Sequence, residues 1–361
     1  MRRRDFVKTT GVGVAGALVA APAIAQSMPE LKWRMTCSWP KSLDTLYGGA
    51  ELMTKAVAEA TDNRFQIQLF AAGEIVPGLQ VVDAVQNGTV EIGHTGSYYY
   101  FGKDPTFAFG SSVAFGPNQR LNQGWYILGG GKELLDEFYK SYNIVSLLAG
   151  NTGCQMGGWF RKEINSVADL HGLKFRIGGF PGKVLQKLGA VPQQIAAGDI
   201  YPSLEKGTID AAEWVGPYDD EKLGLNKVAP HYYYPGWWEG GSMLLAFVNL
   251  DKWRALPKSY QAILEQAGHY ANNWMLAKYD QVNPPALKRL IAAGARLHAF
   301  SPEIMEACFG AARSLHNEIA STNESFRKVY DSLKSFSLSG YEWFQVAELG
   351  YDTFMVRHMR G

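Results

Sequence analysis

The sequence lacks the signatures that identify most enzymes and nucleic-acid-binding proteins. Its three cysteines, Cys37, Cys154 and Cys308, are odd in number and without metal-ligand spacing, so we expect packed thiols. No His-Glu-x-x-His pair and no Gly-x-Ser-x-Gly turn occurs, which removes the usual hydrolase signatures. Lys and Arg total 35 against 34 Asp and Glu. Because this leaves no basic surplus to neutralise a phosphate backbone, nucleic acid is not an expected partner.

Long apolar runs are also absent after the N-terminal segment. That segment has a basic stretch at 2–8, an apolar run over about 11–24 and a small-x-small cleavage site at Ala23-Ile24-Ala25. We interpret residues 1–25 as a signal peptide of the twin-arginine type, with an uncleaved N-terminal anchor as the alternative. No later run approaches the ~20 apolar residues of a membrane span, so we expect the mature chain in the periplasm.

What the sequence does contain is a regular alternation of strand and helix patterns. Its 361 residues exceed the ~250–300 at which one hydrophobic core stops growing, so two lobes are expected. The first half predicts strands at 31–38, 65–69 and 90–95 and helices at 46–60 and 79–86. The second predicts strands at 173–177, 192–196 and 209–214 and helices at 181–188 and 201–206. Beyond residue 250 the pattern is helical, at 258–279, 285–293, 303–320 and 341–359.

These patterns predict an α/β fold of two lobes with a cleft between them, as in a type II-like periplasmic binding protein. We assign residues 26–150 and about 240–285 to one lobe and 151–239 to the other. The remainder, about 286–361, is a helical C-terminal extension. Its last segment carries many large apolar residues and needs a partner surface, which is either its own lobe or a second subunit.

An internal repeat supports the two-lobe interpretation. Val85–Glu91 aligns with Leu204–Asp210, and in each stretch a glycine ends a helix just before a strand. Ligands of parallel sheets bind beyond the carboxyl ends of the strands, so we expect Thr95–Tyr100 and Glu213-Trp214 to face a shared crevice. The alternative is that a Gly-Thr-x-acid turn recurs by chance.

Arg176 is the first candidate ligand-binding residue. It ends a buried strand and is followed by Gly178-Gly179 at the start of a helix. Arginine is almost never fully buried without a partner, and its planar fork matches a carboxylate. We therefore expect Arg176 to hold a substrate carboxylate, with a structural ion pair to an internal Asp or Glu as the alternative.

Oxygen-bearing side chains form a second candidate group. Gln155 interrupts a glycine-rich stretch where an apolar residue is expected, and Glu213 and Glu239 follow apparent strand ends among aromatic residues. Two carboxylates, an amide and a backbone carbonyl make an all-oxygen site for a hard cation, and the oxygen count favours calcium. The alternatives are the carboxylate pair of a glycosidase and two separately solvated acids.

Aromatic and acidic clusters have structural interpretations as well as functional ones. The aromatic stretches at 98–101, 232–234 and 237–238 suit core or lobe-interface packing or, alternatively, sugar stacking. One hydroxyl of the first stretch, that of Tyr100, is expected to reach a ligand oxygen. The acidic run Asp219–Glu221 lies near a helix start, where negative charge favours the helix dipole, and is interpreted as structural.

Longer motifs resemble a known family. These motifs are Gly150–Phe160, Asp169–Arg176, Leu204–Asp210, Glu213–Lys222 and Tyr234–Gly241. They are similar to the extracytoplasmic solute receptors of tripartite ATP-independent periplasmic (TRAP) transporters, and especially to the 2-oxo acid (pyruvate) binding branch. The likeness spans the whole mature chain.

The resemblance implies a receptor, not an enzyme, that closes on a small 2-oxo or 2-hydroxy monocarboxylate and delivers it to integral membrane subunits. Arg176 is implied to clamp the carboxylate. Hydrogen bonds to the ligand are implied for Asn151 and Tyr100. The implied cation ligands, which also meet the acid, are Gln155, Glu213, the Trp214 carbonyl and Glu239. By the resemblance the ion is Na⁺, with Ca²⁺ as the alternative, and the C-terminal helices form a homodimer.

Two residues depart from the family pattern. Phe101 stands where the pattern has Trp, and Cys154 stands where it has Val. Both departures bear on ligand preference and leave the class unchanged. The rival class is a periplasmic glycoside hydrolase that uses Glu213 and Glu239.

Overall fold

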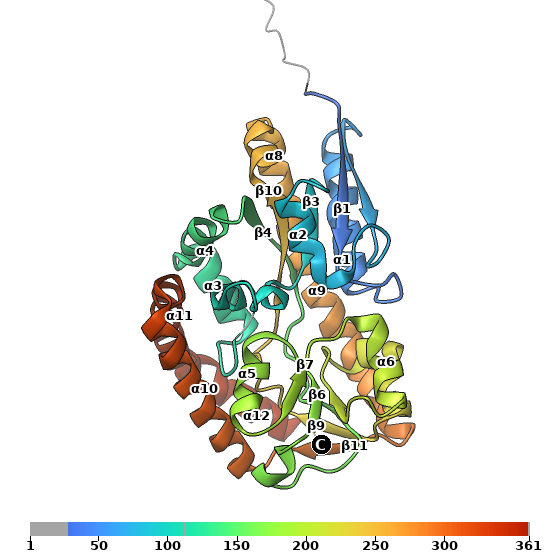
Figure 1. Ribbon diagram of the computed structural model, residues 1–361, viewed down its shortest axis with the longest axis vertical. Helices are drawn as coiled ribbons and strands as arrows, with labels where there is room; N and C mark the ends of the chain where they lie inside the picture. Colours follow the sequence, from blue (N-terminus) through green and yellow to red (C-terminus); the bar gives the residue numbers. More distant parts are fainter. Residues whose placement is uncertain (1–27, 112, 360–361) are drawn as a thin grey trace, which may run out of the picture.

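Two β-sheets, one above the other in Figure 1, form the centres of two α/β lobes. The computed structural model describes residues 28–111 and 113–359, so the expected signal peptide at 1–25 lies outside the described residues. Lobe I contains a five-stranded sheet in the order β2-β1-β3-β10-β4, and lobe II a six-stranded sheet in the order β11-β9-β5-β8-β6-β7. The predicted two-lobed α/β fold is confirmed.

The strands of lobe I are β1 (Leu31–Cys37), β2 (Phe65–Phe70), β3 (Ile92–Thr95), β4 (Ile144–Asn151) and β10 (Met243–Asn249). Those of lobe II are β5 (Gly158–Phe160), β6 (Lys174–Arg176), β7 (Val191–Gln193), β8 (Ala211–Ala212), β9 (His231–Tyr234) and β11 (Arg296–Ala299).

The first helices are α1 (Leu46–Ala60), α2 (Val81–Gln86), α3 (Gln119–Leu128), α4 (Gly131–Lys140), α5 (Gly179–Lys187), α6 (Ala197–Glu205), α7 (Pro217–Leu223) and α8 (Leu250–Ala255). The last are α9 (Lys258–Ala292), α10 (Pro302–Thr322), α11 (Glu324–Phe344) and α12 (Gly350–His358), and a π-helical segment (Gln345–Leu349) joins α11 to α12.

Both lobes share one strand plan. In lobe I, β1 lies between β2 and β3 and pairs with both in parallel. In lobe II, β6 lies between β7 and β8 and again pairs with both in parallel. Gly88 and Gly207, the glycines of the aligned stretches, have φ of +77° and +72°, a conformation that side chains with a Cβ rarely adopt. The repeated letters therefore correspond to a repeated structure.

Alternation of apolar and polar residues builds the core of lobe I. Phe65 and Ile67 of β2 are buried while the intervening Gln66 is exposed, as the two-residue period of a strand requires. Met53 and Val57 of α1 lie in the same apolar cluster, four residues apart on one helix face. Burial of each such side chain contributes roughly 1.5–3 kcal/mol.

The C-terminal half differs from the sequence prediction in two ways. Helices expected at 258–279 and 285–293 are one helix, α9, which continues through Pro284 and Pro285 and packs on β4, α1 and α7. Packing along its length stabilises a helix that two prolines disfavour locally. The strand β11 lies in the segment that was expected to be a helical C-terminal extension. It pairs in parallel with β9 of lobe II, and no local sequence pattern indicates this partner.

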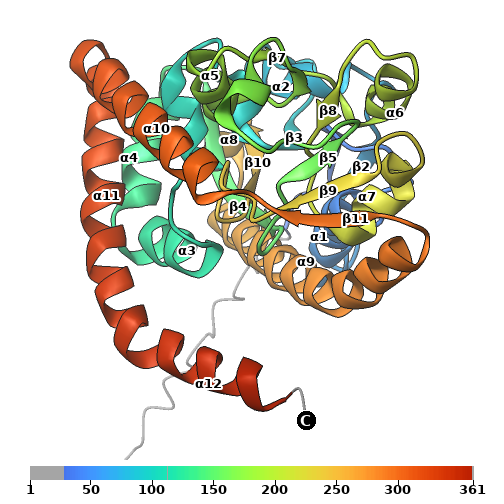
Figure 2. The same ribbon diagram turned by 90° about the horizontal axis from the view of Figure 1, so that it is seen from below.

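The last helices run along one side of the molecule, and α12 extends away from it (Figure 2). α11 packs on α3 and α4 of lobe I, whereas α12 contributes no buried residue. Trp343, Val346 and Phe354 are each more than half exposed. In the part of the chain that the structure describes, no helix combines the length and apolarity needed to cross a membrane.

Candidate functional site

Neighbouring parallel strands of lobe II bring Arg176 and Glu213 together. Arg176 ends β6, and Glu213 directly follows β8, the strand beside it. Arg176 Nη1 donates to the Glu213 carbonyl oxygen at 2.6 Å and forms an ion pair with the Glu213 carboxylate. Arg176 Nε donates to the Ile195 carbonyl at 3.1 Å. Nη2, however, has no hydrogen-bond partner among the described residues. The internal ion pair is therefore present, and one end of the guanidinium remains available.

The guanidinium of Arg176 lies in an aromatic environment. Only 1% of the residue is exposed, and its guanidinium carbon lies 4.9 Å from the ring centre of Trp214. Burial disfavours the charged form, but Glu213, Tyr98 and Tyr99 outweigh it and raise the pKa of Arg176 above its usual value. Arg176 therefore carries a permanent positive charge in a buried environment, and its Nη2 has N–H groups without a partner among the described residues.

Two carboxylates lie beside this charge. Burial raises the pKa of Glu213 above its ordinary value, Arg176 opposes the rise, and the neighbouring Glu239 and Asp220 add to it. Glu239 Oε2 accepts a hydrogen bond from Ser242 Oγ at 3.0 Å. Glu213 and Glu239 line one small cavity together with Tyr98 of lobe I.

The turn after β4 adds an amide to the group. Gln155 Nε2 donates to Thr152 Oγ1 at 2.9 Å, and its Oε1 has no partner in the described part of the chain. Thr152 Oγ1 also accepts from the Ser242 backbone N–H at 2.8 Å, which joins this turn to the segment that carries Glu239. A Cβ on Gly241 (φ +130°) would lie 2.0 Å from the Gly153 carbonyl oxygen, so glycine is required there.

Residues of both lobes surround the polar group formed by Arg176, Glu213, Glu239 and Gln155. A second small cavity is lined by Trp39, Leu46, Tyr98, Thr152, Gln155, Trp214, Val215, Glu239, Ser242 and Leu244. Trp39 of lobe I and Trp214 of lobe II meet across it, with ring centres 6.2 Å apart. The indole Nε1 of Trp214 lacks a hydrogen-bond partner among the described residues. The expected meeting of Thr95–Tyr100 with Glu213-Trp214 thus occurs, through Tyr98.

Three buried polar groups without hydrogen-bond partners among the described residues lie at or beside these cavities: Gln155 and Trp214 line the second cavity, and Arg176 lies against the Trp214 ring and pairs with Glu213 of the first. They are a donor on Arg176, an acceptor on Gln155 and a donor on Trp214. Buried polar groups in proteins are nearly always hydrogen-bonded, so such a cluster indicates a ligand with both acceptor and donor-like character. Gln155 and Glu239 line one cavity and Glu213 and Glu239 the other, and oxygen atoms of these types are the ligands that a hard cation prefers.

Asn151 and Tyr100 are the two residues expected to hydrogen-bond the ligand. Asn151 ends β4, and its Oδ1 accepts from the Gly153 N–H at 2.8 Å, which leaves the amide nitrogen for a ligand. The Tyr100 hydroxyl accepts from the Val82 N–H at 3.1 Å and lies 3.4 Å from Thr95 Oγ1, inside lobe I. Tyr100 lines neither cavity, and its expected contact with a ligand stays a prediction.

Tyr98, by contrast, lines both cavities, and the local geometry explains why. Ser97–Tyr100 is a 3₁₀ turn, in which successive side chains point about 120° apart. Tyr98 therefore faces the cavities, whereas Tyr100 satisfies a backbone N–H at the start of α2. The three consecutive tyrosines in the sequence indicated a functional turn but not which hydroxyl it presents.

Sequence reasoning also missed Trp39. The Trp39 indole N–H donates to His94 Nδ1 at 2.8 Å, and His94 Nε2 lies 3.0 Å from the Ala149 carbonyl. Burial lowers the pKa of His94 to about 4, so the ring is neutral and donates from Nε2 to that carbonyl. His94 thus fixes the orientation of Trp39. A tryptophan directly after a strand end is the signal that would have found it.

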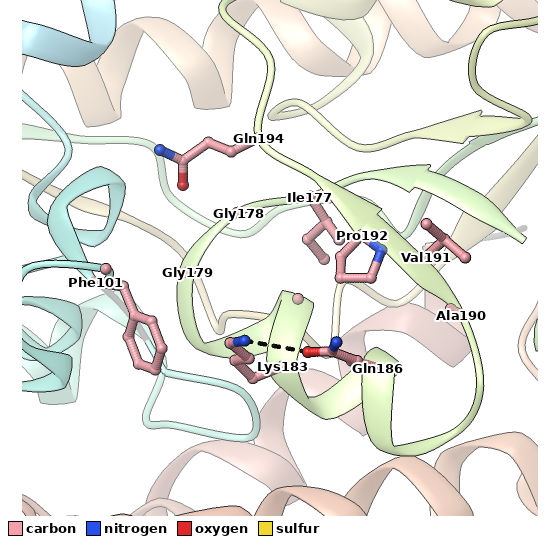
Figure 3. A pocket seen from close by; sticks show the side chains of 12 residues that line it. Phe101, Ile177, Gly178, Gly179, Lys183, Gln186, Ala190, Val191, Pro192 and Gln194 are labelled. Carbon is pink, nitrogen blue, oxygen red and sulfur yellow. Dashed lines mark hydrogen bonds between the residues drawn. The ribbon is translucent and has the colours of Figure 1, made fainter.

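An open hollow beside α5 adjoins the cavity that is lined by Glu213 and Glu239 (Figure 3). Ile177 and Gly178 line both this hollow and the cavity of Glu213 and Glu239. Lys183 is held by Gln186 within α5 at 3.2 Å. Phe101, one of the two departures from the family pattern, lies at this hollow and contacts Phe180, with ring centres 6.3 Å apart.

The cysteines and acidic run are structural, with one exception. Cys37 and Cys308 are free and buried, as expected, but Cys154 is exposed, because its turn carries Gln155 inward and Cys154 outward. Asp219 accepts from Thr45 Oγ1 (2.6 Å) and the Tyr279 hydroxyl (2.7 Å). Asp220 accepts from the Trp159 indole and Tyr232 hydroxyl. Burial raises the pKa of Asp219 to about 6 and that of Asp220 to about 7.

Comparison with known proteins shows the family of the chain. Residues 37–323 match the family described as Bacterial extracellular solute-binding protein, family 7. The chain belongs to this family. It is 50% identical over 360 residues, 98% of this chain and 99% of its relative, to the monocarboxylate 2-oxoacid-binding periplasmic protein of Nostoc sp.. The family resemblance stated from the sequence motifs is confirmed.

Two solved structures of family members have the same fold. A TRAP transporter solute-binding protein from Bordetella bronchiseptica is 51% identical with a TM-score of 0.91, covering 92% of this chain and 99% of its own. That protein is a dimer whose sites contain either calcium with picolinate or no ligand. A TRAP periplasmic solute-binding protein from Pseudoalteromonas atlantica, with bound sodium and pyruvate, is 38% identical with a TM-score of 0.87 and coverage of 89% and 98%.

Proposed function

We propose that this family member is a periplasmic receptor that captures a small 2-oxo or 2-hydroxy monocarboxylate, pyruvate foremost, together with Na⁺ or Ca²⁺. It then delivers the acid to the integral membrane subunits of a TRAP transporter. The convergence of three unpartnered buried groups on Arg176, Gln155 and Trp214 supports this proposal most directly. The similarity to proteins named for 2-oxo acids, and to one solved with sodium and pyruvate, supports the ligand class.

The carboxylate and the 2-oxo oxygen of the proposed ligand each have matching polar atoms at the site. Arg176 Nη2 takes a carboxylate oxygen, because Nη1 is already paired with Glu213. Trp214 Nε1, the Tyr98 hydroxyl and the Asn151 amide nitrogen are further donors toward the carboxylate and the 2-oxo oxygen. Gln155 Oε1 is an acceptor and cannot meet a carboxylate directly, so a cation between the two reconciles them.

The proposed cation ligands are the oxygens of Gln155, Glu213, Glu239 and the Trp214 carbonyl. The charged groups at the site are the Glu213 and Glu239 carboxylates and the Arg176 guanidinium, and a bound acid adds one negative charge. A divalent ion neutralises this sum, whereas a monovalent ion leaves one net negative charge. At equal concentrations we therefore expect Ca²⁺ to support binding more strongly than Na⁺.

Binding acts by favouring closure of the two lobes. Tyr98 and Trp39 approach the group from lobe I, whereas Arg176, Glu213 and Trp214 belong to lobe II. A ligand that touches both sets makes contacts that an open form lacks, and this differential affinity shifts the population toward the closed form.

Titration calorimetry of the untagged mature protein tests the proposal. The protein is first treated with chelator in sodium-free buffer, then titrated with pyruvate in the presence of Na⁺, Ca²⁺ or neither. We expect one site per chain and at least about tenfold weaker binding without either cation. Equal affinity in all three buffers would refute the cation bridge, and no heat with any 2-oxo or 2-hydroxy acid would refute the receptor assignment.

We propose that no covalent chemistry accompanies binding. A glycosidase would need Glu213 or Glu239 as an available nucleophile or acid, but Glu213 is ion-paired with Arg176. Incubation with chromogenic glycosides is expected to give no turnover. Turnover that is lost in Glu213→Gln would establish the hydrolase instead.

A further inference from the structure

Two histidines and a glutamate that line neither cavity of the candidate site come together at the outer edge of the lobe II sheet. His231 begins β9, His298 lies in the edge strand β11, and Glu163 follows the end of β5. The parallel register pairs His231 with Arg296 and Tyr233 with His298. Because side chains two residues apart share a face, the two histidines lie diagonally on the same face of the sheet.

The three side chains have the spacing of metal ligands. His231 Nδ1 lies 3.1 Å from His298 Nε2 and 3.8 Å from Glu163 Oε1. The three potential ligand atoms all lie within 4.8 Å of one another. Two ligand atoms at ~2.0–2.1 Å from a tetrahedral ion lie about 3.4 Å apart, so the two distances from His231 need to change by only a few tenths of an ångström, and the third pair, within 4.8 Å, by at most about 1.4 Å.

The donor types select the class of ion. Imidazole nitrogens with one carboxylate suit Zn²⁺ and similar first-row transition ions, whereas Na⁺ and Ca²⁺ prefer oxygen ligands alone. We propose that Glu163, His231 and His298 form a binding site for a Zn²⁺-class divalent ion, with a fourth position open to water. The competing arrangement is a simple hydrogen bond between the two imidazole rings.

Neighbouring groups prepare the site. Tyr233 stacks on the His298 ring with centres 4.9 Å apart at 19°, and its hydroxyl accepts from the Ile164 N–H at 2.7 Å. These contacts fix the orientation of one ligand ring. Burial lowers the pKa of His231, with added repulsion from His298 and Arg296 and an opposing effect of Glu163. Arg296 disfavours a cation, and the Glu163 carboxylate offsets it.

The position of the site gives the ion a structural consequence. β11 is the edge strand through which the chain passes from α9 to α10 (Figure 2). The three ligands come from β9, β11 and the turn after β5, so a bound ion links three neighbouring segments. We therefore expect the ion to stabilise the attachment of β11, and with it the base of the C-terminal helices, to lobe II.

Calorimetric titration of the untagged, chelator-treated mature chain with ZnCl₂, in excess Ca²⁺ to saturate all-oxygen groups, tests the proposal. We expect one ion per chain and a higher melting temperature with Zn²⁺. Glu163→Gln and His298→Ala should each weaken binding about tenfold or more, whereas His358→Ala, at an exposed histidine, should leave it unchanged. Glu163 is exposed, so its variant preserves the fold even if His298→Ala does not.

A second readout separates ligation from general surface binding. Co²⁺ bound by two imidazoles and a carboxylate should give a visible absorption band that disappears in Glu163→Gln. No Zn²⁺ binding by the parent chain, or equal binding by the parent and both ligand variants, would overturn the proposal. Because pyruvate plays no part in these titrations, the outcome is independent of the proposed receptor function.

Discussion

At the scale of single residues, Arg176 has the internal ion pair that the sequence patterns offer as the alternative to ligand binding, and the proposed function assigns it the ligand carboxylate as well. Its Nη1 and Nε bind Glu213 and Ile195 of its own lobe, and its Nη2 remains without a partner among the described residues. The internal bonds fix the guanidinium, so a ligand meets a preorganised donor and little side-chain entropy is lost on binding. A buried arginine that lacks one of its hydrogen-bond partners is therefore the feature that marks the candidate site.

Arg176→Lys tests whether the guanidinium bonds to Glu213 and to the ligand carboxylate at the same time. Lysine keeps the charge but cannot bond to Glu213 and a ligand carboxylate along one rigid plane. We expect pyruvate affinity to fall about tenfold to a hundredfold, the loss of one charge-assisted hydrogen bond, when measured by calorimetry. The control is Arg161→Lys, at an exposed position of the same lobe, which should bind like the parent. Unchanged affinity in Arg176→Lys would remove the guanidinium from the proposed contact.

Residue types were more predictable than residue positions. Arg176, Gln155, Glu213, Trp214 and Glu239 are polar or aromatic interruptions of buried stretches, and the structure brings them together. Tyr98 and Tyr100 could not be told apart, because both are tyrosines of one turn and their directions depend on its 3₁₀ geometry. That geometry results from tertiary contacts, which a single sequence does not contain.

At the scale of elements, a polar cluster joins the two lobes outside the candidate site. The Asp44 carboxylate, just before α1 of lobe I, forms ion pairs with Lys222 of α7 and Lys278 of α9, the latter at 2.8 Å. The Tyr218 hydroxyl donates to Asp44 at 3.2 Å. Lys222 and Lys278 hold the pKa of Asp44 at about 2, against the effect of burial. These contacts stabilise the closed arrangement of α1, α7 and α9.

Asp44→Ala should therefore weaken ligand binding without touching the ligand. The ion pairs are partly exposed, so we expect only about a two- to tenfold loss of pyruvate affinity by calorimetry, with a shift of the free protein toward an open form in small-angle scattering. Lys41→Ala removes an ion pair, with Glu74, that lies within lobe I and should leave the affinity unchanged. Equal affinity of Asp44→Ala and the parent would show that this cluster does not contribute to closure.

Elements with strong local patterns were predicted well. α1 spans the predicted 46–60, and β1 and β2 differ from prediction by one residue at their ends. Buried strands β4 and β10 were missed because continuous burial removes the alternation that marks a strand. β11 was missed because its pairing with β9 depends on a partner far away in the chain.

At the scale of the whole molecule, buried carboxyls set the dependence of stability on pH. The folded-state pKa values of Asp219 and Asp220, about 6 and 7, exceed the ordinary value of 3.8. The folded chain therefore binds more protons than the unfolded chain between these values. Stability falls as pH rises from about 4 to about 7 and is then constant with respect to these groups.

Asp219→Asn should reduce this slope. The shift of Asp219 corresponds to on the order of 3 kcal/mol across that pH range, because one pKa unit equals about 1.4 kcal/mol. Urea unfolding of the parent and variant at several pH values measures it. Asp62→Asn, at an exposed carboxyl of lobe I, is the matched control and should keep the parent slope. An unchanged slope in Asp219→Asn would contradict the assignment.

The exposed apolar face of the C-terminal helices predicts a homodimer. Val346 and Leu349 are 78% and 61% exposed in the single chain, an unfavourable surface for a monomer. We expect light scattering to give a dimer, and Val346→Asp with Leu349→Asp to give a monomer. Ile291→Asp, at an exposed apolar residue of α9, should remain dimeric. A monomeric parent would contradict this expectation.

The most direct test of the account is a crystal structure of the mature protein grown with pyruvate and either Na⁺ or Ca²⁺. We predict a carboxylate oxygen within hydrogen-bonding distance of Arg176 Nη2, and a cation between the acid and Gln155 Oε1. A guanidinium bonded solely to Glu213 and Ile195, with pyruvate located elsewhere or absent, would contradict the central claim.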